Sequence, residues 1–392
     1  MKRISALFLF IVLTDCLLAY SGLKARRVLR DIELANHYFM VTHPLPGDSI
    51  KGRKLYPSNI WTRGVYFEGL MALYQIAPKT YYLDYTVQWA ESNSWDLYGG
   101  HHTRNADNLC CAQTYIDLYR LGVGKDLNKD ILGNVTRAVN YIVASVGRED
   151  WFWVDALQMA MPVFARMAVE KRDIRYLEAM MELYVNTRDH IARIGLFNEI
   201  EGLWWRDQHY IPPYKEPNGK NCYWSRGNGW AYAALVRTMN ELIVAKDVFE
   251  EEDKKKLNNY YQRLKSDFLK MSWSVKSCQR EDGFWNRSLM DSCHYGGKET
   301  TGTALFVYGM SWGVRQKLLS PEIYYPVIEK GWNGLSSDAL KADGSLGYVQ
   351  GTGKEPKDGH PVDYDSRPDF DDFGLGCFLL AGTEVYRLLQ EM

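Results

Sequence analysis

The chain has 392 residues, and its 47 Lys and Arg residues nearly balance its 48 Asp and Glu residues. With a net charge of −1, there is no electrostatic reason to expect nucleic acid as a partner. Aromatic residues make up 14% of the chain, a share that suits sugar-binding surfaces and large helical cores alike. The length allows two average domains or one large barrel.

Residues 1–21 are typical of a secretory signal peptide. A charged start and a compact apolar run precede the small residues Ala19 and Ser21, which predict cleavage before Gly22. The apolar run is too short for a comfortable membrane span. We therefore expect an exported, periplasmic protein without stable membrane insertion. A lipoprotein anchored through Cys16 is the less favoured alternative.

Six cysteines remain after this cleavage, and their spacing matches no zinc motif. We expect most of them to be buried as small apolar residues. A bridge between Cys278 and Cys293, across one loop, is a minor alternative. The six are Cys110, Cys111, Cys222, Cys278, Cys293 and Cys377.

Helical patterns alternate along the chain between two types. The first type has a charged or polar face, and it is expected at 26–41, 78–93, 127–146, 172–190, 251–271 and 321–340. The second type is apolar nearly all round, and it is expected at 61–74, 105–119, 155–167, 227–242, 299–314 and 371–389.

Helices that are apolar on every side must be covered on every side. Six such helices, each paired with an amphipathic one, predict an inner ring sheathed by an outer ring. We therefore expect an all-α fold, an (α/α)6 barrel that forms one catalytic domain over residues 22–392. A superhelical solenoid is the alternative, but its repeats would have constant length.

Three connections in the second half of the chain are unusually long, at 195–226, 275–298 and 341–370. They are rich in Gly, Pro, Trp, Tyr and Asp, and loops of this length in a compact domain are usually functional. Each leads into an apolar helix. In a barrel of alternating helices, all three would lie on one rim, at the level of Asp155.

Asp155 opens an apolar helix within the stretch DWFWVDALQMAMP, residues 150–162. One interpretation is a first-turn acid that is stabilised by the free N–H groups there. The other is a carboxyl group in an aromatic pocket. In that case Trp151, Phe152 and Trp153 would desolvate the carboxyl and raise its pKa, which keeps a proton available near neutral pH.

Asp107 occupies a comparable position at the start of the preceding apolar helix. Two carboxyl groups facing each other across a pocket are typical of glycosidic chemistry, and the charge of Asp107 could raise the pKa of Asp155. The stretch YWSRGNGW, residues 223–230, adds further candidates. Arg226 could fork onto a carboxylate, and Trp224 and Trp230 could stack on a sugar or simply fill the core.

The motifs WVDALQMAMP, WSRGNGW, DGFW and ETTGTALFVYGMSWGV occur in this order from residue 153 to residue 314. Together they resemble the unsaturated rhamnogalacturonyl hydrolases, glycoside hydrolase family 105, which are relatives of the unsaturated glucuronyl hydrolases. The resemblance runs from about Trp61 to the C-terminus. It implies the same (α/α)6 barrel that the helix pattern predicts.

The resemblance also implies an activity. Such enzymes remove a 4,5-unsaturated uronic acid from the non-reducing end of lyase-generated oligosaccharides, here favoured to be of the rhamnogalacturonan or pectin type. An acid protonates the enol-ether double bond, water adds at C5, and no metal or cofactor is needed. By motif, Asp155 resembles the general acid and base and Asp107 its partner, while Trp153, Arg226 and Trp230 resemble substrate contacts.

One stretch departs from the family pattern. Family members often place a His shortly before the YWSRGNGW-type motif, whereas this chain reads GLWWRDQHY at residues 202–210. Arg206 falls near that position and His209 follows three residues later, so either, or neither, could contact substrate. An Arg there would favour extra negative charge on the substrate.

Two other functions remain open at this point. The first is a conventional inverting glycosidase that uses Asp107 and Asp155 on the same barrel. The second is a non-catalytic glycan-binding protein, which the presence of both acids disfavours. The ultraviolet absorbance of an unsaturated uronide, which its hydrolysis removes, separates the first alternative from the favoured function.

Overall fold

A computed structural model describes residues 22–126 and 129–392 of the chain. The expected signal peptide, including Cys16, lies outside these residues. Across the described ranges, no helix is both long and apolar enough to cross a membrane.

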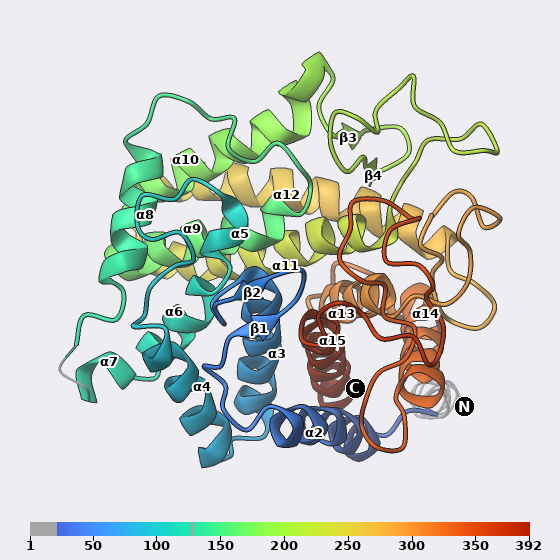
Figure 1. Cartoon of the computed structure of the whole chain (residues 1–392). Helices are drawn as coiled ribbons and strands as arrows, with labels where there is room; N and C mark the ends of the chain where they lie inside the picture. Colours follow the sequence, from blue (N-terminus) through green and yellow to red (C-terminus); the bar gives the residue numbers. More distant parts are fainter. Residues whose placement is uncertain (1–21, 127–128) are drawn as a thin grey trace, which may run out of the picture.

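The described residues form two concentric sets of six helical segments (Figure 1). The inner set comprises α3 (Trp61–Ile76), the pair α5 and α6 (Ala106–Leu109 and Ala112–Arg120), α9 (Ala156–Lys171), α11 (Ser225–Val248), α13 (Thr300–Arg315) and α15 (Phe373–Glu391). The outer set comprises α2 (Ala25–Thr42), α4 (Thr80–Ser92), α8 (Gly133–Val143), α10 (Ile174–Val185), α12 (Glu251–Ser277) and α14 (Pro321–Gly334).

The inner helices form a closed ring. Each packs on the next, and α15 returns to pack along α3, as Figure 1 shows for the red and blue helices at its centre. The expected (α/α)6 barrel is therefore confirmed, and the open solenoid is excluded. The closure depends on small residues, since a Cβ added at Gly376 would lie 2.2 Å from the Val65 carbonyl oxygen.

The burial pattern explains which helices lie inside. In α13, every residue from Thr300 to Val314 is buried, so the helix needs neighbours on all sides. The outer helix α12 instead buries a single stripe. Its apolar members are Leu257, Leu264, Phe268, Met271 and Val275.

Several helix bounds differ from the expected ones. The apolar helix predicted at 105–119 is split into α5 and α6, where the chain passes close to Gly64 of α3. The amphipathic helices predicted to reach residues 190 and 340 end in π-helical turns, Asn186–His190 and Leu335–Ala339. The helix predicted at 127–146 is found over Gly133–Val143, and residues 127–128 lie outside the described part of the chain.

The remaining elements are short. The helix α7 (Val123–Asp126) and a 3-10 turn (Ile191–Arg193) lie between longer helices. The strands β1 (Ile50–Lys51) and β2 (Leu55–Tyr56) pair antiparallel, with Ile50 opposite Tyr56. The strands β3 (Phe197–Asn198) and β4 (Leu203–Trp204) pair in the same way.

All six described cysteines are free thiols, so the alternative of a Cys278–Cys293 bridge is wrong. Four of them are buried, as expected: Cys110, Cys111, Cys222 and Cys377.

The three long connections contact one another on one rim of the barrel. Ser288 Oγ donates to Glu216 Oε1 at 2.9 Å, which joins the first connection to the second. Arg287 Nη1 lies 3.0 Å from His360 Nδ1, which joins the second to the third. The rim predicted from the helix alternation is therefore assembled from all three.

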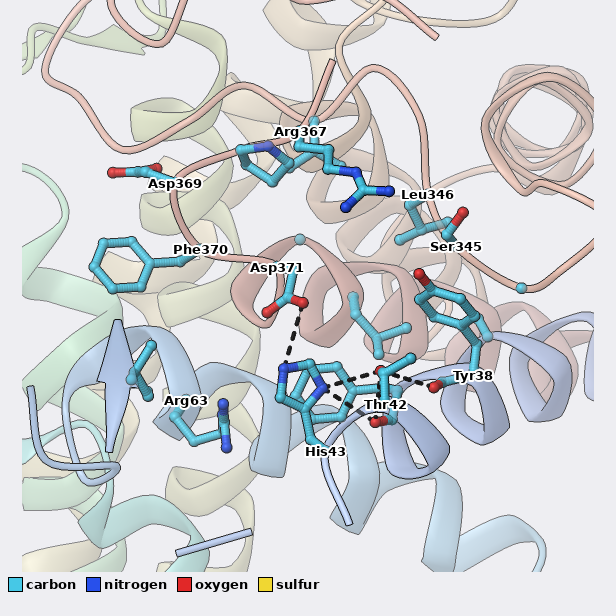
Figure 2. Close-up of a pocket in the computed structure, with 18 of the residues that line it drawn as sticks. Tyr38, Thr42, His43, Arg63, Ser345, Leu346, Arg367, Asp369, Phe370 and Asp371 are labelled. Atoms are coloured by element: carbon cyan, nitrogen blue, oxygen red, sulfur yellow. Dashed lines mark hydrogen bonds and ion pairs between the residues drawn. The ribbon is translucent and has the colours of Figure 1, made fainter. Parts of the chain in front are cut away.

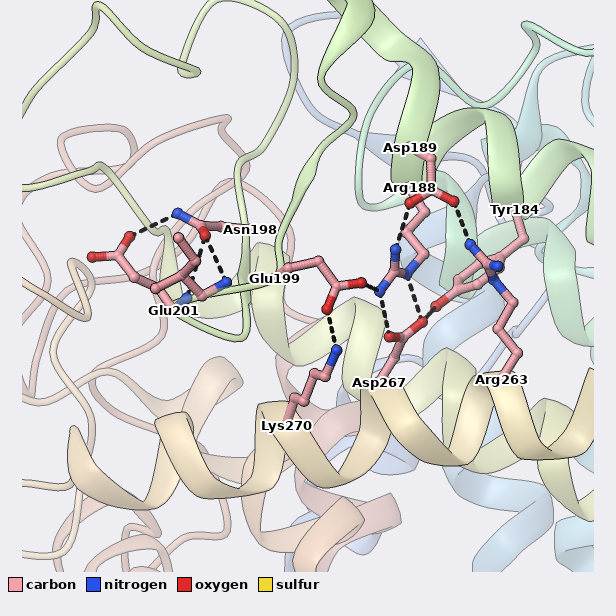
Figure 3. Close-up of polar contacts among 10 residues, drawn as sticks. Tyr184, Arg188, Asp189, Asn198, Glu199, Glu201, Arg263, Asp267 and Lys270 are labelled. Atoms are coloured by element: carbon pink, nitrogen blue, oxygen red, sulfur yellow. Dashed lines mark hydrogen bonds and ion pairs between the residues drawn. The ribbon is translucent and has the colours of Figure 1, made fainter.

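A buried ion-pair cluster anchors the first connection to the outer helix α12 (Figure 3). Arg188 donates to both carboxylate oxygens of Asp267, from Nε and Nη2, at 2.7 Å each. Tyr184 donates to the same carboxylate at 2.6 Å, and Glu199 contacts both Arg188 and Lys270. The start of the first connection is therefore held against α12.

Candidate active site

A cavity of about 810 Å³ opens between the starts of the inner helices and the rim connections. The inner helices and their leading residues contribute Trp61, Asn105, Asp107, Trp153, Asp155 and Met159 to its lining. The rim connections contribute Arg206, Tyr210, Glu355, Asp369 and Phe370. Both predicted catalytic acids therefore face the same space.

Backbone pairing between two distant segments places Asp155 beside Arg206. Trp153 and Asp207 form an antiparallel bridge, and the Val154 amide donates to the Arg206 carbonyl at 2.8 Å. As a result, Arg206 Nε lies 3.4 Å from Asp155 Oδ2. Arg206 Nη1 also donates to Asp207 Oδ2 at 2.6 Å, so the guanidinium bridges two carboxylates.

Asp155 immediately precedes α9, but its side chain does not cap that helix. Its Oδ2 atom is buried and accepts no hydrogen bond within the described part of the chain. The side chain is 13% exposed, so it is desolvated and yet open to the cavity. This geometry favours the interpretation of an acid in a pocket over that of a helix cap.

Asp107 is likewise free of capping duty. The helix α5 is capped by Asn105, whose side chain accepts from the Asp107 amide at 2.9 Å. The carboxyl group of Asp107 is therefore available to the cavity. Because α5 packs against α9, the two acids are carried by neighbouring helices.

Burial raises the pKa of both acids. The pKa of Asp107 rises to about 7, because burial and the charge of Asp155 outweigh the opposing charge of Arg206. The pKa of Asp155 is also raised by burial, but Arg206 and then Arg226 oppose the rise. The sequence analysis predicts that the charge of Asp107 raises the pKa of Asp155. In the structure it is instead the charge of Asp155 that raises the pKa of Asp107.

Glu68, which the sequence analysis did not single out, connects the helix that follows Asp107 to the helix that follows Asp155. Its buried carboxyl group accepts three hydrogen bonds, from Cys110, Gln113 and Gln158, at 3.2, 2.8 and 2.9 Å. Cys110 follows Asp107 by three residues, and Gln158 follows Asp155 by three. Burial raises the pKa of Glu68 to about 7, with the charge of Arg237 opposing.

The aromatic cluster before Asp155 is only partly at the site. Trp153 lines the cavity, whereas Trp151 is fully buried and packs edge-on against Phe164. Phe152 is 60% exposed and lies outside. The expectation that all three rings enclose Asp155 is therefore wrong, since Trp151 packs in the core and Phe152 is exposed to solvent.

Arg226, Trp224 and Trp230 lie behind the cavity wall instead of on its surface. Arg226 is buried and donates to the carbonyls of Gln350 and Gly351 at 2.6 and 2.7 Å. Its guanidinium lies over the Trp224 ring, 4.6 Å from the centroid. Trp230 is fully buried, edge-on to the cavity residue Trp61.

The two candidates in the stretch GLWWRDQHY lie in different places. Arg206 lines the cavity, whereas His209 is exposed outside it. Tyr210, at the end of the same stretch, also lines the cavity and was missed. Glu355 and Asp369 were missed as well, because the third connection has no periodicity from which a side-chain direction could be read.

A closed double ring of helices that holds a desolvated carboxyl pair in a rim cavity has the two acids that glycosidic chemistry uses. The chain belongs to glycosyl hydrolase family 88, whose family model matches residues 32–389. The protein is thus a glycoside hydrolase, and the resemblance drawn from the four motifs is confirmed. The non-catalytic alternative is thereby set aside.

Individual relatives cover most of the chain. The unsaturated 3S-rhamnoglycuronyl hydrolase of Formosa agariphila is 28% identical over 349 residues, which is 84% of each protein. A protein of the same name from an Alteromonas species is 28% identical and covers 84% of this chain and 78% of its own. The solved structure of a family 88 glycosyl hydrolase from Bacteroides vulgatus, 32% identical, superposes with a TM-score of 0.80, covering 93% of this chain and 100% of that one.

Proposed function

We propose that the protein removes the 4,5-unsaturated uronic acid from the non-reducing end of oligosaccharides produced by polysaccharide lyases. The observation that carries the proposal is the contact between Asp155 and Arg206 in the rim cavity, 3.4 Å between Oδ2 and Nε. It combines a desolvated acid, which enol-ether protonation requires, with a cation suited to a uronate. Family membership and the names of the relatives support the same activity.

The chemistry assigns roles to the two acids. Asp155 delivers a proton to C4 of the double bond, and a water molecule adds at C5 to give a hemiketal. Asp155, now ionised, takes up a proton from that water. The hemiketal opens to a ketone, and the hemiacetal left at C1 releases the next sugar as an alcohol. Asp107 holds a second proton near neutral pH and limits the charge in the cavity.

Arg206 couples substrate binding to this proton transfer. In the free site, its charge favours the ionised form of Asp155. A uronate carboxylate that pairs with Arg206 brings a negative charge to the same place and offsets the guanidinium. The pKa of Asp155 then rises, because an anion beside a carboxyl group disfavours its ionisation. The acid therefore becomes protonated when its substrate is bound.

For the sugar beyond the uronide, rhamnose leads within this proposal. The motif resemblance favours rhamnogalacturonan fragments, and the curated relatives carry rhamnoglycuronyl in their names. We further propose that the mature protein begins near Gly22 and acts after export, as residues 1–21 suggest.

The test is an activity screen on lyase-generated oligosaccharides that differ in the sugar next to the unsaturated end. Hydrolysis removes the conjugated double bond, so ultraviolet absorbance falls as the reaction proceeds. Release of a saturated sugar without a change in absorbance would instead identify a conventional glycosidase. An enzyme that leaves every unsaturated substrate unchanged would refute the proposal.

A further inference from the structure

A second cavity, of about 590 Å³, shares part of its lining with the active-site cavity. Figure 2 shows the residues that line this second cavity. It is bounded by the outer helix α2, the strand β1 and two segments of the third connection, 341–346 and 366–371. Asp369 and Phe370 line both cavities, so they form the partition between them. The volume is within the range of sites that bind small ligands.

The partition is held in place from one side. The Phe370 ring meets the Tyr56 ring edge-on, with 5.8 Å between centroids. Gly52 lies under the same ring, where an added Cβ would be 2.8 Å from Phe370 Cζ. Asp369 is fixed by Thr352, whose amide donates to its Oδ1 at 2.8 Å. Phe370 is therefore a fixed aromatic side chain in the wall that the two cavities share.

Most charges around the second cavity have partners. His43 Nε2 lies 3.4 Å from Asp371 Oδ2, as the dashed line in Figure 2 marks. Arg63 donates to Asp372 at 3.2 Å, and Lys341 lies 3.5 Å from Asp365. The remaining lining acid on this side, Asp343, accepts from Ser345 at 2.8 Å.

Arg367 is different. No hydrogen bond, ion pair or ring contact is formed by its side chain within the described ranges. Figure 2 shows its guanidinium reaching over the cavity, towards Leu346 and above Asp371. Lys51 and Asp48 also line the cavity, from the region around β1, and their side chains likewise form no hydrogen bond or ion pair within the described ranges. Arg367 is therefore a lining cation without a partner whose guanidinium faces the cavity.

We propose that the second cavity binds the part of the oligosaccharide beyond the scissile bond, and that Arg367 pairs with an anionic group on it. The unsaturated uronide would occupy the first cavity, and the following sugars would pass over Phe370 into the second. Sugar faces stack on aromatic rings, and a guanidinium fork suits a carboxylate or a sulfate. This inference rests on the proposed function and adds to it a preference for longer, acidic substrates.

The experiment compares Arg367→Ala with the wild type on an unsaturated disaccharide and on an unsaturated tetrasaccharide with a second acidic sugar. We expect KM for the tetrasaccharide to rise about tenfold, the size of a lost charge-assisted contact, while kcat stays unchanged. Both constants for the disaccharide should be unaffected. Arg26→Ala, which removes an exposed and unpaired Arg at the start of α2, is the matched control and should change neither substrate.

Further substrates identify the anion. Three tetrasaccharides are compared, in which the second acidic sugar carries a carboxylate, carries a sulfate, or has its carboxylate reduced to a neutral alcohol. Arg367→Ala should raise KM for the two charged substrates and leave KM for the neutral one unchanged. An equal effect on the neutral substrate, an equal effect on the disaccharide, or no effect on any substrate would overturn the inference. Each of these results requires an active wild type, whereas an inactive wild type refutes the proposed function itself.

A second variant tests the passage. Phe370→Ala should raise KM for the tetrasaccharide more than for the disaccharide, because only the longer substrate crosses the partition. Equal increases for both substrates would place Phe370 in the active-site cavity alone and contradict the path proposed here.

Discussion

Arg206 Nε lies 3.4 Å from Asp155 Oδ2, and neither atom has a hydrogen-bond partner within the described part of the chain. An acid and a cation that are buried together in this way are partly, but not fully, compensated. Arg206 also lines the cavity, so a ligand carboxylate in the cavity can pair with the guanidinium. The position of Arg206 therefore ties substrate charge to the protonation of the acid that the reaction uses.

Arg206→Gln should shift the pH profile. Removal of the cation eliminates the charge that lowers the pKa of both Asp155 and Asp107, so both pKa values should rise. The basic limb of kcat/KM should therefore move to higher pH. KM should also increase about tenfold, because the uronate loses a charged partner.

The control for this variant is His209→Ala. His209 is three residues further along the same connection, but it is exposed outside the cavity. We expect its pH profile and KM to match those of the wild type. A shift with His209→Ala, or an unmoved profile with Arg206→Gln, would contradict the role given to Arg206.

Arg226→Lys should act mainly on stability. Arg226 holds the carbonyls of Gln350 and Gly351 with two separate nitrogens, which a single ammonium group cannot reproduce. We expect the free energy of unfolding to fall by about 2 kcal/mol. The third connection should also become more sensitive to limited proteolysis. Urea titration measures the first effect, and unchanged stability with a raised KM would instead favour direct substrate contact.

Glu68→Gln should change how stability depends on pH. The folded pKa of Glu68 is about 7, above its ordinary value of 4.5, so the folded protein binds this proton more tightly than the unfolded chain. The resulting stability is fully present below pH 4.5 and is lost as the pH rises through 7.

The measurement is the free energy of unfolding at pH 5 and at pH 8. The wild type should lose about 2 to 3 kcal/mol more than Glu68→Gln between these two values. Glu281→Gln, at an exposed position on the second connection, should follow the wild type. If Glu68→Gln keeps the full pH dependence, the buried carboxyl group is already ionised in the folded protein.

The sequence was sufficient to predict the barrel, because its evidence is local. An apolar helix such as Trp61–Ile76 has apolar residues on every side, and these residues predict that it is buried on every side. The alternation of such helices with polar ones then requires two rings. The joint location of Asp107 and Asp155 followed from the same regularity, since both precede or open inner helices. Helix ends were less predictable, because the π-helical turns reflect packing against later segments.

Contacts between distant segments were beyond local evidence. The partners of Arg226, Gln350 and Gly351, lie more than 120 positions away in a connection without periodicity. The sequence therefore offered no sign of these contacts, and a substrate contact was the interpretation left for Arg226. The role of Glu68 depends on Gln113 and Gln158 in two other helices. The choice between Arg206 and His209 required the backbone pairing with the segment before α9.

The central claim is that Asp155 supplies the proton to the double bond. Asp155→Asn keeps the size and shape of the side chain but has no transferable proton. The decisive measurement is the loss of ultraviolet absorbance of an unsaturated uronide, followed for this variant and for the wild type, with circular dichroism and substrate binding as controls for folding.

We predict that Asp155→Asn folds and binds substrate normally and that its kcat falls by at least 10²- to 10⁴-fold, the range typical of a general acid–base step. A kcat near that of the wild type, on a substrate that the wild type hydrolyses, would contradict the account. Asp155 would then be no more than an acid at the start of a helix.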